Sequence, residues 1–137
     1  FLFFIFKNLQ FVLITLSCLL LGITFTLFFM ILFNLNFNFA NMISLPLLFS
    51  LGVSYPVYFL RRYKELENLN KVIKSKTPPA ILLSASTTIC SFSTLAISSH
   101  QGTSSMGILL FISLTMTVVS SLIFIPLMIK MFKVSSR

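Results

Sequence analysis

The stretch FANMISLPLLFSLGVSYPVYFLRRY, residues 39–63, decides the fold. Residues 42–60 carry no charged side chain, and these 19 residues are about as many as a helix needs to cross the hydrocarbon core of a bilayer. Arg61 and Arg62 end the uncharged run and Lys64 follows, which is typical of a transmembrane segment reaching a membrane surface. The stretch therefore predicts a transmembrane helix.

Two prolines, Pro46 and Pro56, interrupt this helix. Each removes one backbone donor and frees a carbonyl one turn back, so the helix is predicted to kink or open locally. Between them, Gly52, Ser54 and Tyr55 supply a close-approach position, a hydroxyl and a phenol. Because polar groups in lipid need protein partners or water, we expect this helix to lie inside a bundle. It is either a proline-kinked packing helix or one that lines a transport or proton path.

The composition is that of an integral membrane protein. Of the 137 residues, 57% are hydrophobic, and the mean hydropathy is +1.03. The formal net charge of +8 could suggest a nucleic-acid partner. The basic residues, however, lie at the ends of apolar segments, which is the positive-inside pattern and not a solvated basic face. The bilayer is the predicted partner, and nucleic acid is excluded.

Uncharged segments predict an all-α polytopic membrane helix bundle, a single membrane domain over residues 1–137. Four complete spans are expected, and residues 1–6 look like the tail of a fifth. Because the chain begins with Phe1 inside an apolar run, we expect a piece of a longer protein or a processed product. The four predicted spans are residues 11–33, 42–60, 80–97 and 106–129.

The linker at residues 61–79 is the hydrophilic part of the chain and holds six of the ten basic residues. It is predicted to be a juxtamembrane helix that ends before Pro78 and Pro79, and to lie in the cytoplasm with the C-terminus. The connectors at residues 34–41 and 98–105 have no Lys or Arg and are expected on the other side. The basic residues either set this topology or also attract anionic lipid.

The third span carries seven hydroxyls, which is unusual for a transmembrane helix. Four of them, Ser84, Thr87, Ser91 and Thr94, are spaced three or four residues apart and therefore share one face of the helix. They either serve small-residue packing, each bonding a carbonyl one turn back, or form a polar lining opposite Ser54 and Tyr55. The seven are Ser84, Ser86, Thr87, Thr88, Ser91, Ser93 and Thr94.

Small and polar residues also recur at helical spacing in the first span, where they predict a face for tight helix packing: Ser17, Cys18, Gly22 and Thr26. Cys18 and Cys90 are expected to be unpaired, buried, small apolar residues, because both fall within predicted spans. Asn41 is the expected N-cap of the second span.

The sequence contains few residues of the types that carry out catalysis. The chain has one histidine, His100, and two glutamates, with no metal-ligand spacing and no nucleophile–base pair. His100 is either a structural loop histidine or a proton-handling group. No enzyme activity, cofactor or metal is predicted.

Two stretches resemble the C-terminal membrane block of the RND superfamily, closest to the MMPL branch and its proteins associated with hopanoid biosynthesis. They are FNFANMISLPLLFSLGVSYPVYFLRRY and AILLSASTTICSFSTLAISSHQGTSSMGILLFISL. The resemblance covers about residues 10–133. It implies a bacterial inner-membrane exporter of hydrophobic lipids with twelve spans in two halves. This chain would hold spans nine to twelve, and the N-terminal half would be its partner, with a homo-oligomer left open.

The same resemblance bears on energy coupling. Carboxylates in spans four and ten of such transporters commonly relay protons, and many MMPL relatives read GVDY in span ten. Here the motif reads Gly52-Val53-Ser54-Tyr55. A serine does not titrate near neutral pH, and a tyrosine has a reference pKa of about 10. Coupling is therefore expected to depend on the other half.

Two functions remain open on the sequence alone. The intact motif framework favours the membrane part of a lipid exporter, with Gly52, Ser54, Tyr55, Thr87, Thr88, Ser91 and Thr94 as its transport-path residues. The missing carboxylate favours a non-transporting anchor or assembly subunit, or a decayed transporter fragment.

Overall fold

The computed structural model describes residue 6 and residues 8–35 and 38–132, and every regular element in these ranges is a helix. This confirms the all-α membrane bundle. The predicted tail of a fifth span lies outside the described residues, apart from Phe6. The long helices are α2 (Leu9–Leu32), α3 (Phe39–Leu66), α5 (Thr77–Ser93) and α6 (Gln101–Phe132); α4 (Leu69–Ile73) is short, and the 3-10 turn η1 (Thr94–Ile97) extends α5.

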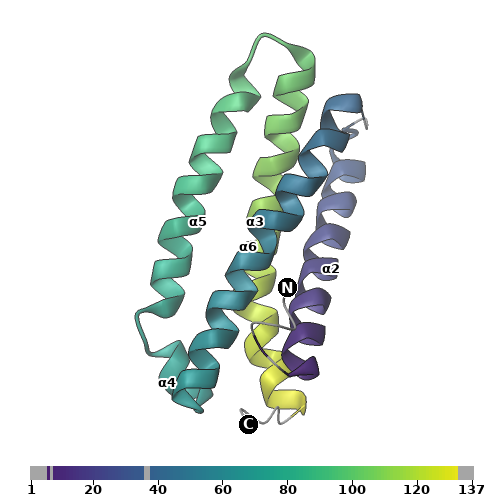
Figure 1. The fold of residues 1–137 in the computed structure, drawn as a ribbon. Helices are drawn as coiled ribbons and strands as arrows, with labels where there is room; N and C mark the ends of the chain where they lie inside the picture. The colour runs from purple at the N-terminus through teal and green to yellow at the C-terminus, as the bar shows by residue number, and fades with distance from the viewer. Residues whose placement is uncertain (1–5, 7, 36–37, 133–137) are drawn as a thin grey trace.

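Helix α6 is the central helix of the described bundle. It packs against α2, α3, α5 and η1, and it lies between α5 and α2, behind α3, in Figure 1. Its fully buried apolar side chains are Leu109, Leu110, Leu114 and Ile125. Helix α5 is the outermost, because only Ile81 and Ala85 of its residues are buried. The described chain therefore covers α6 and leaves most of α5 exposed.

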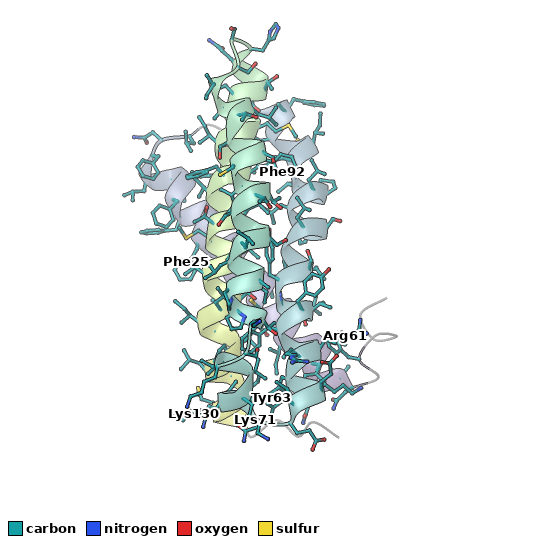
Figure 2. All side chains as sticks on the ribbon, turned by 90° about the vertical axis from the view of Figure 1, so that its left-hand side faces the viewer. Phe25, Arg61, Tyr63, Lys71, Phe92 and Lys130 are labelled. Carbon is teal, nitrogen blue, oxygen red and sulfur yellow. The ribbon has the colours of Figure 1, made fainter. Side chains whose placement is uncertain are left out.

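Charge is concentrated at one end of the bundle. Every described Lys and Arg lies in the last turns of α3, in or beside α4, or at the end of α6. Figure 2 shows Arg61, Lys71 and Lys130 together at this end. The α2–α3 and η1–α6 connections lie at the opposite end (Figure 1). This is the charge separation that the positive-inside rule requires of a multi-span protein.

The start of α3 differs from the prediction. Its N-cap is Asn38, whose side-chain oxygen accepts a hydrogen bond of 3.0 Å from the Asn41 amide. Asn41 is therefore the residue that is capped, and its side chain is buried. The prediction chose the wrong one of two asparagines three residues apart. Either can supply the oxygen, and the choice depends on where the chain turns.

The end of α3 also differs, because the helix continues to Leu66 instead of ending with the uncharged run at residue 60. Arginine is a good helix former, and Arg62 donates to Glu65 one turn later at 2.7 Å. Glu67, with φ of 52°, adopts the left-handed conformation that ends the helix.

The linker at residues 61–79 was predicted to be one juxtamembrane helix, and this prediction is wrong. The linker divides into the end of α3, the short α4 and the start of α5. Pro78 and Pro79 fall in the first turn of α5 instead of following the end of a helix. Prolines are tolerated there because first-turn amides have no intrahelical acceptor.

Helix α3 is continuous through Pro46 and Pro56. Each proline removes a single donor, and the hydrogen bonds on either side hold the helix together. The predicted local opening is therefore wrong, and a bend at either proline stays a prediction.

Candidate functional site

The motif at the centre of α3 lies where three helices meet. Gly52 is buried, and a β-carbon built on it would lie 3.1 Å from Leu19 Cδ2 of α2 and 3.2 Å from Thr117 Cγ2 of α6. One turn along α2, a β-carbon on Gly22 would lie 2.8 Å from Thr117 Oγ1. Two glycines thus allow α2 and α3 to approach the same residue of α6, in the way small residues let membrane helices pack.

The small-residue face predicted on α2 belongs to this crossing. Cys18, Gly22 and Thr26 are buried and Ser17 is half-buried. The Ser120 hydroxyl of α6 donates to the Cys18 carbonyl at 3.2 Å and lies 3.6 Å from its sulfur. The predicted packing face is confirmed, with α6 as its main partner.

Ser54 and Tyr55 differ in what they contact. Ser54 is half-buried, and its hydroxyl donates to the Leu51 carbonyl of its own helix. The Tyr55 side chain is 5% exposed and lies beside the Thr88 side chain of α5. The tyrosine of the motif therefore joins α3 to α5, whereas the serine bonds only within α3.

Most of the hydroxyl face predicted on α5 points away from the bundle, although Ser84 lines an open space between α3 and α5 together with Tyr55. Ser84, Thr87, Ser91 and Thr94 are all exposed in the described chain, and Thr88 beside them is the hydroxyl that contacts α3. Helices α3 and α5 are in contact, as a polar lining opposite Ser54 and Tyr55 requires, but the hydroxyl beside Tyr55 is that of Thr88, and Thr87, Ser91 and Thr94 are exposed. Helical spacing identified the face correctly, but the two buried residues Ile81 and Ala85 turn the other side of α5 inward.

The hydroxyls of α5 mostly bond their own backbone. Thr87 and Thr88 both donate to the Ser84 carbonyl, and Ser91 donates to the Thr87 carbonyl at 2.8 Å. Ser86, Ser93 and Thr94 also donate to carbonyls three or four residues earlier. A hydroxyl satisfied in this way can lie in an apolar medium at little cost, which agrees with the packing interpretation of this helix.

A buried polar stripe on α6 was missed at the sequence level. Ser113, Thr117, Ser120 and Ser121 recur at helical spacing and are all buried. The Thr117 hydroxyl donates to the Ser113 carbonyl, and the Ser121 hydroxyl has no hydrogen-bond partner among the described residues. The spacing argument applied to residues 84–94 would have found this stripe, but five hydroxyls in a 24-residue uncharged run attract less notice than seven in 18.

The remaining predicted residues have mainly structural contacts. Arg61 and Arg62 both approach Glu65, at 4.0 Å and 2.7 Å. Lys64 donates to the Phe6 carbonyl at 3.1 Å, which ties this end of α3 to the start of the described chain. Cys18 is buried as expected, but Cys90 is exposed on α5, contrary to the prediction, since it lies on the outward side of that helix.

Acidic side chains, basic side chains and histidine are absent from the middle of the described helices. The uncharged runs at residues 11–33, 42–60, 80–97 and 106–129 contain no Asp, Glu, Lys, Arg or His. No group of His, Cys, Asp and Glu suited to a metal ion occurs among the described residues. His100 lies exposed in the η1–α6 connection. The site at Gly52–Tyr55 can thus position polar groups but has no group that changes charge near neutral pH.

Together, these features define a class of protein. Four described helices, Leu9–Leu32, Phe39–Leu66, Thr77–Ile97 and Gln101–Met131, are long and apolar enough to cross a membrane. The chain is a multi-pass membrane protein with small and hydroxyl residues at its helix crossings.

Two curated relatives specify the family, and both are named hopanoid transporter HpnN. The protein from Burkholderia multivorans is 38% identical over 117 residues, which is 85% of this chain. The one from Rhodopseudomonas palustris is 39% identical over 113 residues, or 82% of this chain. The chain belongs to the family of these transporters in the MMPL branch of the RND superfamily, so the resemblance is confirmed.

The chain spans only 13% of the length of either relative. No protein-family model matches the chain. No solved structure matches it.

Proposed function

We propose that the chain is the C-terminal membrane part of an RND-type exporter that moves hydrophobic, hopanoid-like lipids from the bacterial inner membrane. The observation that carries this proposal is identity of 38% and 39% to two hopanoid transporters over more than four-fifths of the chain. The exposed side of α5 supports it as well, because a helix with only two buried residues has room for the rest of a larger membrane domain.

In this proposal, Gly52, Tyr55 and Thr88 hold the helices that border the transport path. Ser54 stands in place of the titrating residue of the family motif, and the exposed hydroxyls of Thr87, Ser91 and Thr94 face the remaining half of the protein. The proton-coupling carboxylate belongs to that other half, since an intramembrane relay needs a group that titrates.

A chimera tests the proposal. The matching membrane segment of the Burkholderia multivorans transporter is replaced by this chain, and hopanoid movement is followed in a strain that lacks its own transporter. Retained transport supports the exporter proposal. Loss of transport at normal membrane levels of the chimera supports the alternative of a non-transporting anchor or decayed fragment, which the serine at position 54 favours.

Ser54→Ala in this chimera is expected to change transport by less than about twofold. The hydroxyl donates only to a carbonyl of its own helix, and such a bond contributes about 1 kcal/mol. Ser50→Ala, at an exposed position on the same helix, is the matched control. Ser54→Asp introduces a titratable group and is expected to alter the pH dependence of transport. Abolition of proton-driven transport by Ser54→Ala, with normal expression, would contradict coupling by the other half.

Orientation in the membrane is tested by labelling. Lys74 is expected to face the cytoplasm and Gln101 the opposite side, and both side chains are exposed. Each is replaced by cysteine in a Cys90→Ser background, since Cys18 is fully buried. An impermeant maleimide added to intact cells should label only the Gln101→Cys variant, and both variants after permeabilisation. Labelling of the Lys74→Cys variant alone in intact cells would mean that the orientation is the reverse of the predicted one.

A further inference from the structure

An open cavity of about 780 Å³ lies between α3 and α5 at the basic end of the bundle. Its volume falls within the range of small-molecule sites, about 300–1,000 Å³. Its outer wall includes Arg61, Arg62 and Lys76, and its inner wall includes Tyr55, Ile81 and Ser84.

The cavity crosses the boundary between the apolar and the charged parts of the chain. Tyr55 belongs to the uncharged run at residues 42–60, and Ile81 and Ser84 belong to that at residues 80–97. Arg61 follows the first run directly, and Lys76 precedes the second. A ligand that fills this space would have one end among cations and the other at the level of the membrane's apolar layer.

The charged residues that line the cavity carry a net positive charge. Glu65 is the carboxylate that lines the cavity, against three basic side chains. Its side chain is 51% exposed, and those of Arg61 and Arg62 are 72% and 42% exposed, so these ion pairs hold the arginines only weakly. A planar guanidinium can bind two oxygens of a phosphate at once, and a lysine ammonium adds a third charge.

Backbone amides contribute little at this place, although α5 begins beside the cavity. The Thr77 amide donates to the Ser75 hydroxyl at 3.2 Å, and the Ala80 amide donates to the Lys76 carbonyl at 3.1 Å. Residues 78 and 79 are prolines and have no amide hydrogen. Recognition of an anion here must therefore come from the side chains.

We propose that this cavity binds the phosphate headgroup of an anionic phospholipid, with its acyl chains in the apolar layer beyond Ile81 and Ser84. Basic pockets between transmembrane helices are suited to anionic headgroups, and Tyr58, 61% exposed at the rim, is a residue type enriched at the membrane interface. This site is independent of the proposed export activity.

Native mass spectrometry of the detergent-solubilised 137-residue chain tests the proposal. Phosphatidylglycerol and phosphatidylcholine with identical acyl chains are titrated separately, and phosphatidylglycerol is expected to bind more tightly. The triple variant Arg61→Gln, Arg62→Gln, Lys76→Gln should weaken phosphatidylglycerol binding by about tenfold or more. The variant Arg61→Lys, Arg62→Lys keeps the charge but loses the two-oxygen geometry of the guanidinium groups, so its affinity should lie between those of the parent and the triple variant.

The matched control removes the same charge at the same end of the bundle. Lys71, Lys74 and Lys130 are exposed and do not line this cavity, so changing all three to Gln should alter phosphatidylglycerol affinity by less than about twofold. Equal losses in both triple variants would mean that net charge attracts the lipid, and would overturn the proposal. Equal binding of phosphatidylcholine would overturn it too.

Glycerol phosphate distinguishes a lipid from a soluble anion. It carries the phosphate without acyl chains, so millimolar concentrations should leave the phosphatidylglycerol adduct in place. Displacement at concentrations equal to those of the lipid would assign the cavity to a soluble phosphate compound and contradict the lipid proposal. In a Cys90→Ser background, an unreactive Cys18 in each variant serves as the check of folding, because that thiol is fully buried in the native bundle.

Discussion

Gly107→Ala is expected to destabilise the bundle by about 3 kcal/mol or more, at the upper end of what overpacking costs. A β-carbon at this position would overlap the Ala96 amide nitrogen and lie 2.7 Å from the Leu95 carbonyl carbon. Both atoms belong to the backbone of η1, so no side-chain rotation can make room. Helix α6 would have to separate from η1. That movement would break the 2.7 Å hydrogen bond from the Ser104 hydroxyl to the Ala96 carbonyl.

Gly102→Ala is the matched control on the same helix. Its added β-carbon would lie 3.5 Å from Ala40 Cβ, an ordinary contact, and neither glycine has a positive φ. This variant should be as stable as the parent or up to about 1 kcal/mol more stable, since alanine is the better helix former. Thermal unfolding in detergent, followed by a thiol-reactive dye on buried Cys18 in a Cys90→Ser background, compares the two. Equal melting temperatures for both variants would contradict the close contact of α6 with η1.

The location of the membrane helices could be read from the sequence because hydropathy and charge determine it locally. The uncharged runs at residues 11–33 and 42–60 lie within or beside α2 and α3. The small-residue face with Cys18 and Gly22 was predictable for the same reason, since helical spacing is a local property. The lengths of the helices were not, because arginines after residue 60 end an apolar run without ending a helix.

Features that depend on tertiary packing could not be predicted from the sequence. Spacing placed Thr87, Ser91 and Thr94 on one face of α5 but could not say which side would turn inward. The residue of α5 beside Tyr55 is Thr88, which follows Thr87 in the sequence and is not part of the predicted face. Likewise, nothing local distinguishes Gly107, where an added β-carbon would meet backbone atoms, from Gly102, where it would meet the Ala40 methyl group.

Gly22→Ala is expected to destabilise the bundle by about 1–3 kcal/mol, because it crowds the crossing of α2 with α6. The new β-carbon would lie 2.8 Å from Thr117 Oγ1 and 3.2 Å from Thr117 Cα. The Thr117 hydroxyl is fixed by its 2.7 Å bond to the Ser113 carbonyl, so it cannot turn away freely. Gly52→Ala should cost less, since its contacts are side-chain methyls, Leu19 Cδ2 at 3.1 Å and Thr117 Cγ2 at 3.2 Å.

A double-mutant cycle with Thr117→Ala separates these two contacts. Removing Oγ1 and Cγ2 should relieve only part of the Gly22→Ala destabilisation, because the Thr117 α-carbon remains in place. The same change should relieve most of the Gly52→Ala destabilisation, because the nearest atom that remains, Leu19 Cδ2, ends a flexible side chain. The coupling free energies are measured by the same Cys18 unfolding assay. Additive effects in both pairs would show that Thr117 does not lie between the two glycines, and that α2 and α3 do not meet α6 at this residue.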